Sequence, residues 1–216
     1  MPSQPHPERA QSFGEELANS ISHGLGFVLA IASLPVLLAL RPASGNALDS
    51  AAASVFSATM MLLYGVSTLY HAWPGGRIKR WLNRCDHAAI YLFIAGSYTP
   101  FVLGVLRGGW GWSLFGVIWS LAALGTVAKL ANRLQHPWWS TGLYLAMGWL
   151  AVVAAAPLVA RLPGAGLAWL IAGGLSYTAG AIVFMHDSKV RYAHFVWHLF
   201  VLGGSACHFV AVLRYA

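Results

Sequence analysis

Charged residues are scarce in this sequence. Only 9% of its 216 residues are Asp, Glu, Lys or Arg, and only six of these are acidic. In soluble domains about a quarter of the residues are charged. Because 58% of the residues here are hydrophobic, so few charges could not solvate the surface of a globule. The composition excludes an ordinary soluble domain and predicts an integral membrane protein.

A continuous basic strip is also absent, although the formal net charge is +7. The basic residues lie between apolar runs, so we expect no nucleic-acid partner and assign them to membrane orientation. The N-terminal stretch lacks a basic patch that leads into a short apolar run and a cleavage site, so we expect no removable signal peptide. The apolar runs lack period-two alternation, which argues against a membrane β-barrel.

Cysteine is rare, with Cys85 and Cys207 alone. Neither residue has the spacing that is typical of metal ligands. The spans predicted below place the two cysteines near opposite ends of the membrane. We therefore expect two free thiols and no disulfide.

Long apolar runs, in contrast, are plentiful. A helix needs about 20 apolar residues to cross a bilayer, and seven runs qualify, over residues 20–40, 50–72, 86–106, 110–130, 141–158, 165–185 and 193–213. The connecting segments are too short for a soluble domain. The sequence therefore predicts a polar N-terminal segment over residues 1–19 and a single all-α domain over residues 20–216, a bundle of seven transmembrane helices. Pro100 should kink the third helix.

The distribution of basic residues predicts how this bundle is oriented. With seven spans, nine basic residues fall on the side of the N-terminus and four fall on the other side. The positive-inside rule then places the N-terminus in the cytoplasm and the C-terminus outside. Tryptophans near the breaks between spans fit an aromatic belt at the membrane interface and need no ligand to explain them.

Ionisable residues inside the spans are costly in lipid and therefore mark candidate functional sites. The stretch "RYAHFVWHLF" carries two histidines four residues apart, so both lie on one helix face. The stretches "YGVSTLYHAW", "NRCDHAAIYLFIAGSYTPF" and "EELANSISHGLG" carry further polar residues at helix ends. The predicted topology brings all of them to one layer near the cytoplasmic face: Glu16, Asn19, His23, Ser67, His71, Asp86, His194 and His198.

Two histidines at i and i+4 form a platform for a metal ion. His71 could join His194 and His198 as a third nitrogen ligand, and three protein ligands with one open position are typical of catalytic zinc. In such a site Asp86 could act as a general base, and Ser67 could orient the site or donate to a developing oxyanion. Glu16, Asn19 and His23 are candidates for supporting roles.

Spacing alone leaves other interpretations open. The same histidines could ligate haem, with His71 facing the i,i+4 pair, and Asp86 could pair with Arg84 or Arg80 at the interface. Isolated histidines are more often interfacial anchors or hydrogen-bond partners between helices. We interpret His87, His136 and His186 in this way. His208 lies about 21 Å along the helix from His194, which is too far for the same metal, and we expect it to bond a neighbouring helix.

These residues carry a resemblance that covers nearly the whole chain. The stretch "EELANSISHGLG", the Ser67 and His71 pair, "DHAAIYLFIAGSYTPF" and the His194 and His198 pair together resemble the bacterial hemolysin III family, within the superfamily of progestin and adipoQ receptors. The resemblance implies seven helices with a cytoplasmic N-terminus, in the bacterial inner membrane. It also implies zinc bound by His71, His194 and His198, with Asp86 and Ser67 beside it, and so favours zinc over haem.

The resemblance implies less about activity, because adiponectin receptors of this superfamily are associated with ceramidase activity whereas the hemolysin III branch was named for cytolysis. Three functions follow as hypotheses. The first is a zinc-dependent intramembrane hydrolase of a lipid amide or ester, with a membrane lipid as its partner. The second is a receptor or membrane-fluidity sensor in which zinc is structural. The third is a pore-forming cytolysin, which we rank lowest because polar residues cluster at one end of the spans. The residues indicate no protein partner.

Overall fold

The computed structural model describes residues 9–40 and 46–216, and all regular secondary structure in this part of the chain is helical, without strands. Residues 1–8 of the predicted polar segment, which ends at residue 19, lie outside the described residues. The helices are α1 (Phe13–Ala39), α2 (Ala47–Ala72), α3 (Arg77–Pro100), α4 (Gly108–Leu130), α5 (Pro137–Gly148), α6 (Ala155–Arg161), α7 (Gly164–Phe184) and α8 (Ala193–Tyr215). A π-helical segment, η1 (Phe101–Leu106), continues α3, and a 3₁₀ segment, η2 (Trp149–Ala154), joins α5 to α6.

Seven of these helical stretches in the described residues are long and apolar enough to span a membrane. This confirms the predicted seven-helix membrane fold. The fifth span, over Pro137–Arg161, consists of α5, η2 and α6 together. Two spans begin well before the apolar runs indicated, α1 at Phe13 instead of residue 20 and α3 at Arg77 instead of residue 86. Polar residues can occupy the first turns of a spanning helix because those turns lie at the interface.

Local sequence explains where α1 begins. The hydroxyl of Ser12 accepts from the backbone N–H of Glu15, and the Glu15 carboxylate accepts from the backbone N–H of Ser12. This reciprocal capping box satisfies two N–H groups that a helix start leaves unpaired. At the far end of the third span, the π-helical segment starts directly after Pro100. Proline cannot donate a backbone hydrogen bond, and such wide turns are a common response.

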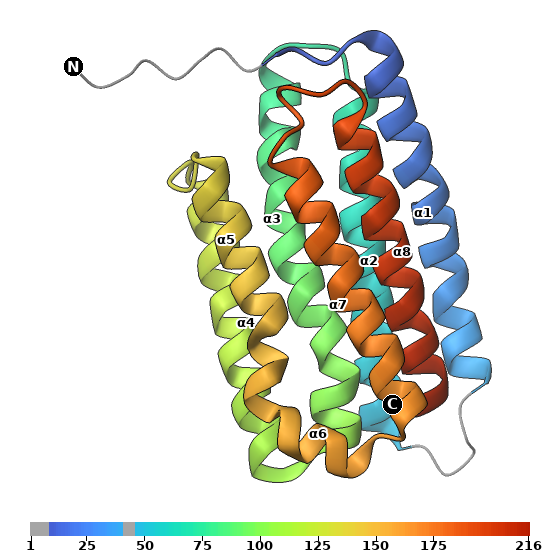
Figure 1. Cartoon of the computed structure of the whole chain (residues 1–216). Coiled ribbons are helices and arrows are strands. Elements are labelled where there is room, and N and C mark those ends of the chain that lie inside the picture. Colours follow the sequence, from blue (N-terminus) through green and yellow to red (C-terminus); the bar gives the residue numbers. More distant parts are fainter. Residues whose placement is uncertain (1–8, 41–45) are drawn as a thin grey trace.

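The bundle consists of two groups of helices (Figure 1). The spans α1, α2, α3, α7 and α8 lie side by side, and α4 and α5 lie together next to α3. The pairs α1 with α2, α2 with α3, α1 with α8 and α7 with α8 are in contact. Close approach of α7 and α8 depends on glycine, since a Cβ atom at Gly204 would stand 2.6 Å from the ring of Tyr177. The start of α1 and the end of α8 lie at opposite ends of the bundle.

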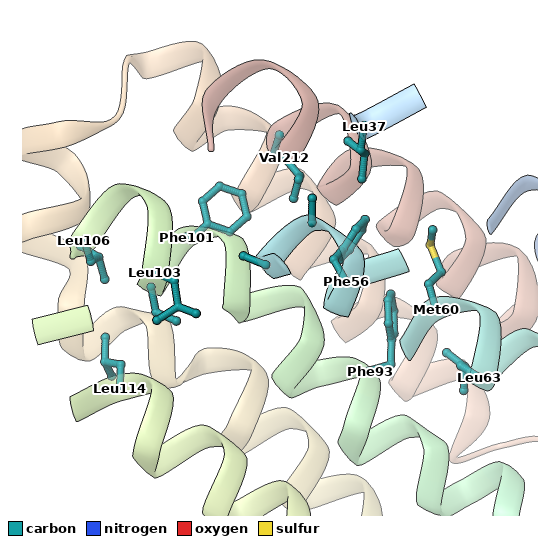
Figure 2. Packing of buried hydrophobic residues seen from close by; sticks show 14 of the residues in the cluster. Leu37, Phe56, Met60, Leu63, Phe93, Phe101, Leu103, Leu106, Leu114 and Val212 are labelled. Atoms are coloured by element: carbon teal, nitrogen blue, oxygen red, sulfur yellow. The ribbon is translucent and has the colours of Figure 1, made fainter. Parts of the chain in front are cut away.

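Apolar residues fill the interior of the bundle (Figure 2). Phe56 is fully buried and lies 6.1 Å from Phe93, centroid to centroid, in a cluster with Met60 and Leu63. The outer surface is apolar as well, with large side chains such as Phe13 exposed to 83%. A protein that is apolar both inside and outside is suited to a lipid solvent.

The two cysteines are free. The expectation of no disulfide between Cys85 and Cys207 is therefore confirmed.

Candidate metal centre

Three histidines from two helices converge at one end of the bundle. His71 lies in the last turn of α2, and His194 and His198 lie in the first turns of α8. Each offers a ring nitrogen, and the three ligand atoms lie within 4.8 Å of one another. The ring centroids are 4.8 to 5.1 Å apart. The sequence predicted this set, and the structure brings it together from positions separated by more than 120 residues of chain.

Carboxylates orient two of these rings. The Nδ1 of His71 is 2.7 Å from Oε2 of Glu16, and the Nδ1 of His194 is 3.0 Å from Oδ2 of Asp187. Histidines that bind metals usually donate their other ring N–H to a carboxylate or carbonyl, which fixes the tautomer and the ring orientation. A ring whose Nδ1–H donates in this way presents the lone pair of its Nε2.

The third ring has neutral partners. The Nδ1 of His198 is 3.1 Å from the hydroxyl of Ser22 and 3.3 Å from the backbone oxygen of Asn19. The Ser22 hydroxyl itself donates to the same Asn19 oxygen at 2.9 Å, so it can accept from His198. Asn19 is fully buried and also donates from Nδ2 to Gln11. Asn19 therefore lies beside His198, and its supporting role stays a prediction from the sequence.

One ligand atom is unsatisfied by the protein. The Nε2 of His71 is buried and has no hydrogen-bond partner, although buried polar atoms nearly always have one. A metal ion at this nitrogen would satisfy it. The converging nitrogens, their hydrogen-bonded Nδ1 atoms and this unpaired Nε2 together fit a metal bound by three imidazoles.

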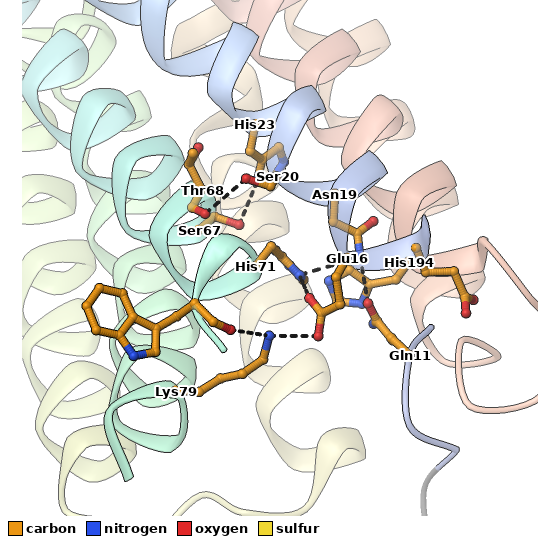
Figure 3. A network of polar contacts seen from close by, with 12 residues as sticks. Gln11, Glu16, Asn19, Ser20, His23, Ser67, Thr68, His71, Lys79 and His194 are labelled. Atoms are coloured by element: carbon orange, nitrogen blue, oxygen red, sulfur yellow. Dashed lines mark hydrogen bonds and ion pairs between the residues drawn. The ribbon is translucent and has the colours of Figure 1, made fainter. Parts of the chain in front are cut away.

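A second layer of contacts holds Glu16 in place (Figure 3). The Nζ of Lys79 is 2.8 Å from Oε1 of Glu16 and also donates to the backbone oxygen of Trp73. One carboxylate therefore joins α1 to His71 of α2 and to Lys79 of α3. Glu16 therefore contacts one of the candidate ligands, and the supporting role predicted from the sequence stays a prediction.

His23 lies beside the three histidines and is not one of the converging group. Its ring stacks on His198 at 3.5 Å with an interplanar angle of 5°. Its Nδ1 is 2.7 Å from the hydroxyl of Ser67, and its Nε2 is buried without a partner. Stacking at this distance fixes the ring of His198, which is a supporting role.

Asp86 and Ser67 meet between α2 and α3. Both side chains are buried, and the Ser67 hydroxyl lies close to the carboxylate of Asp86. Because Ser67 also bonds to His23, the three side chains link α1, α2 and α3. Asp86 and Ser67 line one large cavity together with His194 and His198. All eight residues named from the sequence thus lie at the same end of the bundle.

This cavity has a volume of about 1260 Å³. Beyond the polar end its wall is mainly apolar, with residues of α3, α5, α6 and α7 such as Phe93, Ile94 and Leu170. Trp149, Val152 and Ile171 line it and are also exposed on the outer surface. The cavity is therefore open at the side of the bundle, where lipid would surround it.

The comparisons with known proteins identify the family of the chain. A family model described as "Haemolysin-III related" matches residues 11–209. The chain belongs to the haemolysin III family. It is 44% identical to Hemolysin-3 of Bacillus cereus over 201 residues, and this alignment covers 93% of this chain and 91% of that protein.

More distant relatives extend beyond bacteria. The chain is 30% identical over 211 residues to the human monocyte to macrophage differentiation factor, covering 93% of this chain and 84% of that protein. This relative supports the link to the wider receptor superfamily. No solved structure matches the chain. The family and the seven spans establish a multi-pass membrane protein.

Sequence reasoning missed several residues that support the centre. Asp187 was read only as part of a loop, although it is the one acidic residue in the segment that leads to His194. Ser22 lies three residues from Asn19 and one from His23, yet a serine in an apolar run gave no signal. Lys79 was counted only as a basic charge near the membrane.

A further cluster fixes the start of α8. The buried carboxylate of Glu15 accepts two bonds from Arg9, at 2.6 and 2.8 Å, and one from the backbone N–H of Tyr192 at 2.9 Å. Tyr192 caps α8 in the left-handed region, with φ of 59°. Such a conformation is uncommon for a residue other than glycine, so it needs support from its surroundings. Glu15 thus ties the N-terminal segment to the turn that precedes His194.

The remaining histidines lie elsewhere. His186 lies in the turn after α7, with its Nδ1 2.9 Å from the backbone oxygen of Ile182. His87 packs against Phe184. Both His87 and His136 line the cavity. His208 lies on Tyr177 of α7 at 5.3 Å and also lines the cavity, far from the metal centre. The sequence led us to expect a bond from His208 to a neighbouring helix; the structure shows a ring contact with α7, and its Nδ1 has no hydrogen-bond partner.

Proposed function

We propose that this chain is a zinc-dependent hydrolase that cleaves an amide or ester of a membrane lipid, in the inner membrane of a bacterium, and that contributes to membrane-lipid homeostasis. One observation carries the proposal. Three imidazoles with oriented ring nitrogens lie next to a buried carboxylate, at the polar end of an otherwise apolar cavity. Ligating groups, a base and a hydrocarbon-like cavity are what such a reaction requires.

Zinc suits this donor set better than other metals. Imidazole nitrogens favour zinc among the common ions, and three protein ligands leave a position for water or substrate. When bound there, zinc supplies Lewis acidity, which activates water and polarises a carbonyl. Neither His23 nor Asp86 belongs to the converging group, which supports an open, catalytic site over a closed, structural one.

Asp86 and Ser67 have complementary tasks in this proposal. The carboxylate of Asp86 accepts the proton of the attacking water and returns it to the leaving group, as a general base and then a general acid. The hydroxyl of Ser67 orients that carboxylate, and it can turn to donate to the oxyanion that develops on the substrate carbonyl. His23 fixes Ser67 from the other side through its 2.7 Å contact.

The cavity defines how substrate would reach these groups. Its apolar wall is suited to an acyl chain, and its lateral opening faces the surrounding lipid. A lipid could therefore enter sideways, with its acyl linkage at Asp86 and its chain along α3, α5 and α7. Cavities that bury a ligand against apolar walls, with a few convergent polar groups, are the usual binding sites for small molecules.

Product analysis with a matched pair of variants tests the proposal. Purified protein is incubated with a total bacterial lipid extract, and released fatty acids are measured by mass spectrometry. Asp86→Asn should reduce release at least a hundredfold, on the order of what a general base contributes, and should retain zinc. Asp49→Asn, which removes a carboxylate at the opposite end of α2, should release fatty acid as the wild type does. Equal release by the Asp86→Asn variant would contradict the proposal.

A structural role for zinc is the second candidate. It is favoured by the way the centre joins three helices, with Glu16 on α1, His71 on α2 and His198 on α8. In a receptor or fluidity sensor the ion would clamp these helices. His198→Ala would then lower the melting temperature, and the wild type would release no fatty acid from any lipid.

A further inference from the structure

A second group of polar side chains lines the same cavity on the side of α3, α4 and α5. Its members are Lys129, Ser140, Thr141 and His87, here called the Lys129 group. Lys129 lies in the last turn of α4, Ser140 and Thr141 in the first turns of α5, and His87 in α3. None of them contributes to the metal centre. The cavity therefore has two polar regions at the same end.

A buried ammonium is the main feature of this group. Lys129 is only 9% exposed, and its Nζ donates to the backbone oxygen of Leu134 at 3.0 Å and to the hydroxyl of Ser140 at 3.4 Å. These contacts fix the side chain on the cavity wall. A buried positive charge interacts strongly with an anion, because little water screens it. Its position favours an anionic ligand group over a neutral one.

Two neighbouring atoms lack partners. The hydroxyl oxygen of Thr141, in a residue that is 4% exposed, and the Nδ1 of His87 are both buried without a hydrogen bond. Both residues line the cavity. Buried polar atoms are nearly always satisfied in native proteins, so a ligand with several oxygen atoms would complete this wall. Tyr144 holds the wall together by donating from its hydroxyl to the backbone oxygen of His87 at 2.9 Å.

The Lys129 group lies close to the metal centre. The ring of Phe184 is 6.2 Å from His87 on one side and 5.7 Å from His194 on the other. Asp86 precedes His87 on the same helix, and its carboxylate interacts electrostatically with Lys129. One ligand of moderate length could therefore touch both polar regions, with Phe184 between them.

We propose that the Lys129 group binds the phosphate of a membrane phospholipid whose acyl linkage lies at Asp86. Phosphate has the charge that Lys129 attracts and oxygen atoms to which the unpaired hydroxyl of Thr141 can donate. The location of the acyl linkage rests on the proposed function. Recognition of phosphate does not, because it depends on residues outside the metal centre. The inference narrows the substrate class to lipids with a phosphate near the linkage that is cleaved.

A binding measurement tests this without relying on turnover. Purified, zinc-loaded protein in neutral detergent is titrated calorimetrically with short-chain phosphatidate, with the matching diacylglycerol and with inorganic phosphate. Phosphatidate should bind at least tenfold more tightly than either of the others. Lys129→Met, which keeps the length of the side chain and removes its charge, should weaken phosphatidate binding about tenfold or more, which is typical for loss of a hydrogen-bonded charge.

Two further variants make the test specific. Lys189→Met removes the same charge from an exposed loop at this end of the bundle and should bind phosphatidate as the wild type does. Thr141→Val removes one hydroxyl at almost constant volume and should weaken binding severalfold, which keeps the test valid if Lys129→Met does not fold. Unchanged phosphatidate affinity in both the Lys129 and Thr141 variants would overturn the inference.

The controls separate the remaining outcomes. Equal binding of diacylglycerol and phosphatidate would refute phosphate recognition. If inorganic phosphate bound as tightly as phosphatidate, the site would serve a soluble anion, and the assignment to a lipid would be wrong. Selective phosphatidate binding by a protein that releases no fatty acid would contradict the proposed hydrolase and leave the Lys129 group intact. Hydrolysis of neutral lipids alone would support the proposed hydrolase and overturn phosphate recognition by the Lys129 group.

Discussion

Glu16 offers a quantitative test of how the metal centre is built. Its Oε2 is 2.7 Å from the Nδ1 of His71, and its Oε1 is held by Lys79 at 2.8 Å. Loss of an outer partner of a metal-binding histidine typically costs tenfold to a hundredfold in metal affinity, or about 1.4 to 2.7 kcal/mol. The amide oxygen of glutamine can still accept from Nδ1–H. We therefore expect about tenfold weaker zinc binding for Glu16→Gln and a larger loss for Glu16→Ala.

The assay is competition for zinc between the purified protein and a fluorescent chelator of known affinity. Asp49→Asn is the matched control, because Asp49 pairs with Arg107 about 33 Å from His71 along α2. That variant should bind zinc as the wild type does. If Glu16→Gln and Glu16→Ala both bound zinc with wild-type affinity, the carboxylate would not orient His71 as a ligand, and the reasoning would be refuted.

Glu15, Phe56 and the C-terminus offer three further tests. Glu15→Gln should destabilise the protein by about 2 kcal/mol, since it weakens several bonds to a buried carboxylate, and amide exchange at Tyr192 should increase; unchanged exchange would contradict this. Phe56→Ala should cost about 3 to 5 kcal/mol in the core, seen as a lower melting temperature, with zinc content per folded chain unchanged. Alkaline phosphatase fused after Ala216 should be active in bacteria, because we expect the C-terminus outside; a fluorescent cytoplasmic reporter at that position would show the reverse.

Much of the fold was predictable because the bilayer imposes simple rules. Only a helix satisfies its own backbone in lipid, so seven apolar runs gave seven spans. The first residues of α1 and α3 were harder to predict, because their first turns are polar and do not raise the hydropathy of the sequence. In α1 the signal was present in Ser12 and Glu15, a capping box spaced three residues apart.

The candidate ligands were also predictable, because the topology assigns each helix end to one side. His71 ends a helix, and His194 and His198 begin one, so all three had to lie in one layer. The hydrogen-bond partners of these histidines depend on side-chain direction and on packing between helices, which cannot be predicted from one sequence alone. Asp187 contacts His194 only because the turn at Tyr192 folds the loop back onto α8.

The Lys129 group was missed for a related reason. Lys129 was counted as a basic residue at the membrane surface, where lysine commonly extends into water. Its burial depends on the contacts to Leu134 and Ser140 across the α4–α5 connection. Those contacts form only when α5 packs against α3 and α4, and no local sequence pattern predicts that packing.

The central claim is that His71, His194 and His198 hold zinc. Metal analysis of the purified wild type beside His198→Ala, by inductively coupled plasma mass spectrometry, tests it most directly. We expect about one zinc ion per wild-type chain and little or none in His198→Ala, with zinc retained in Asp86→Asn. Equal zinc in the wild type and in His198→Ala, or none in any of the three proteins, would contradict the account.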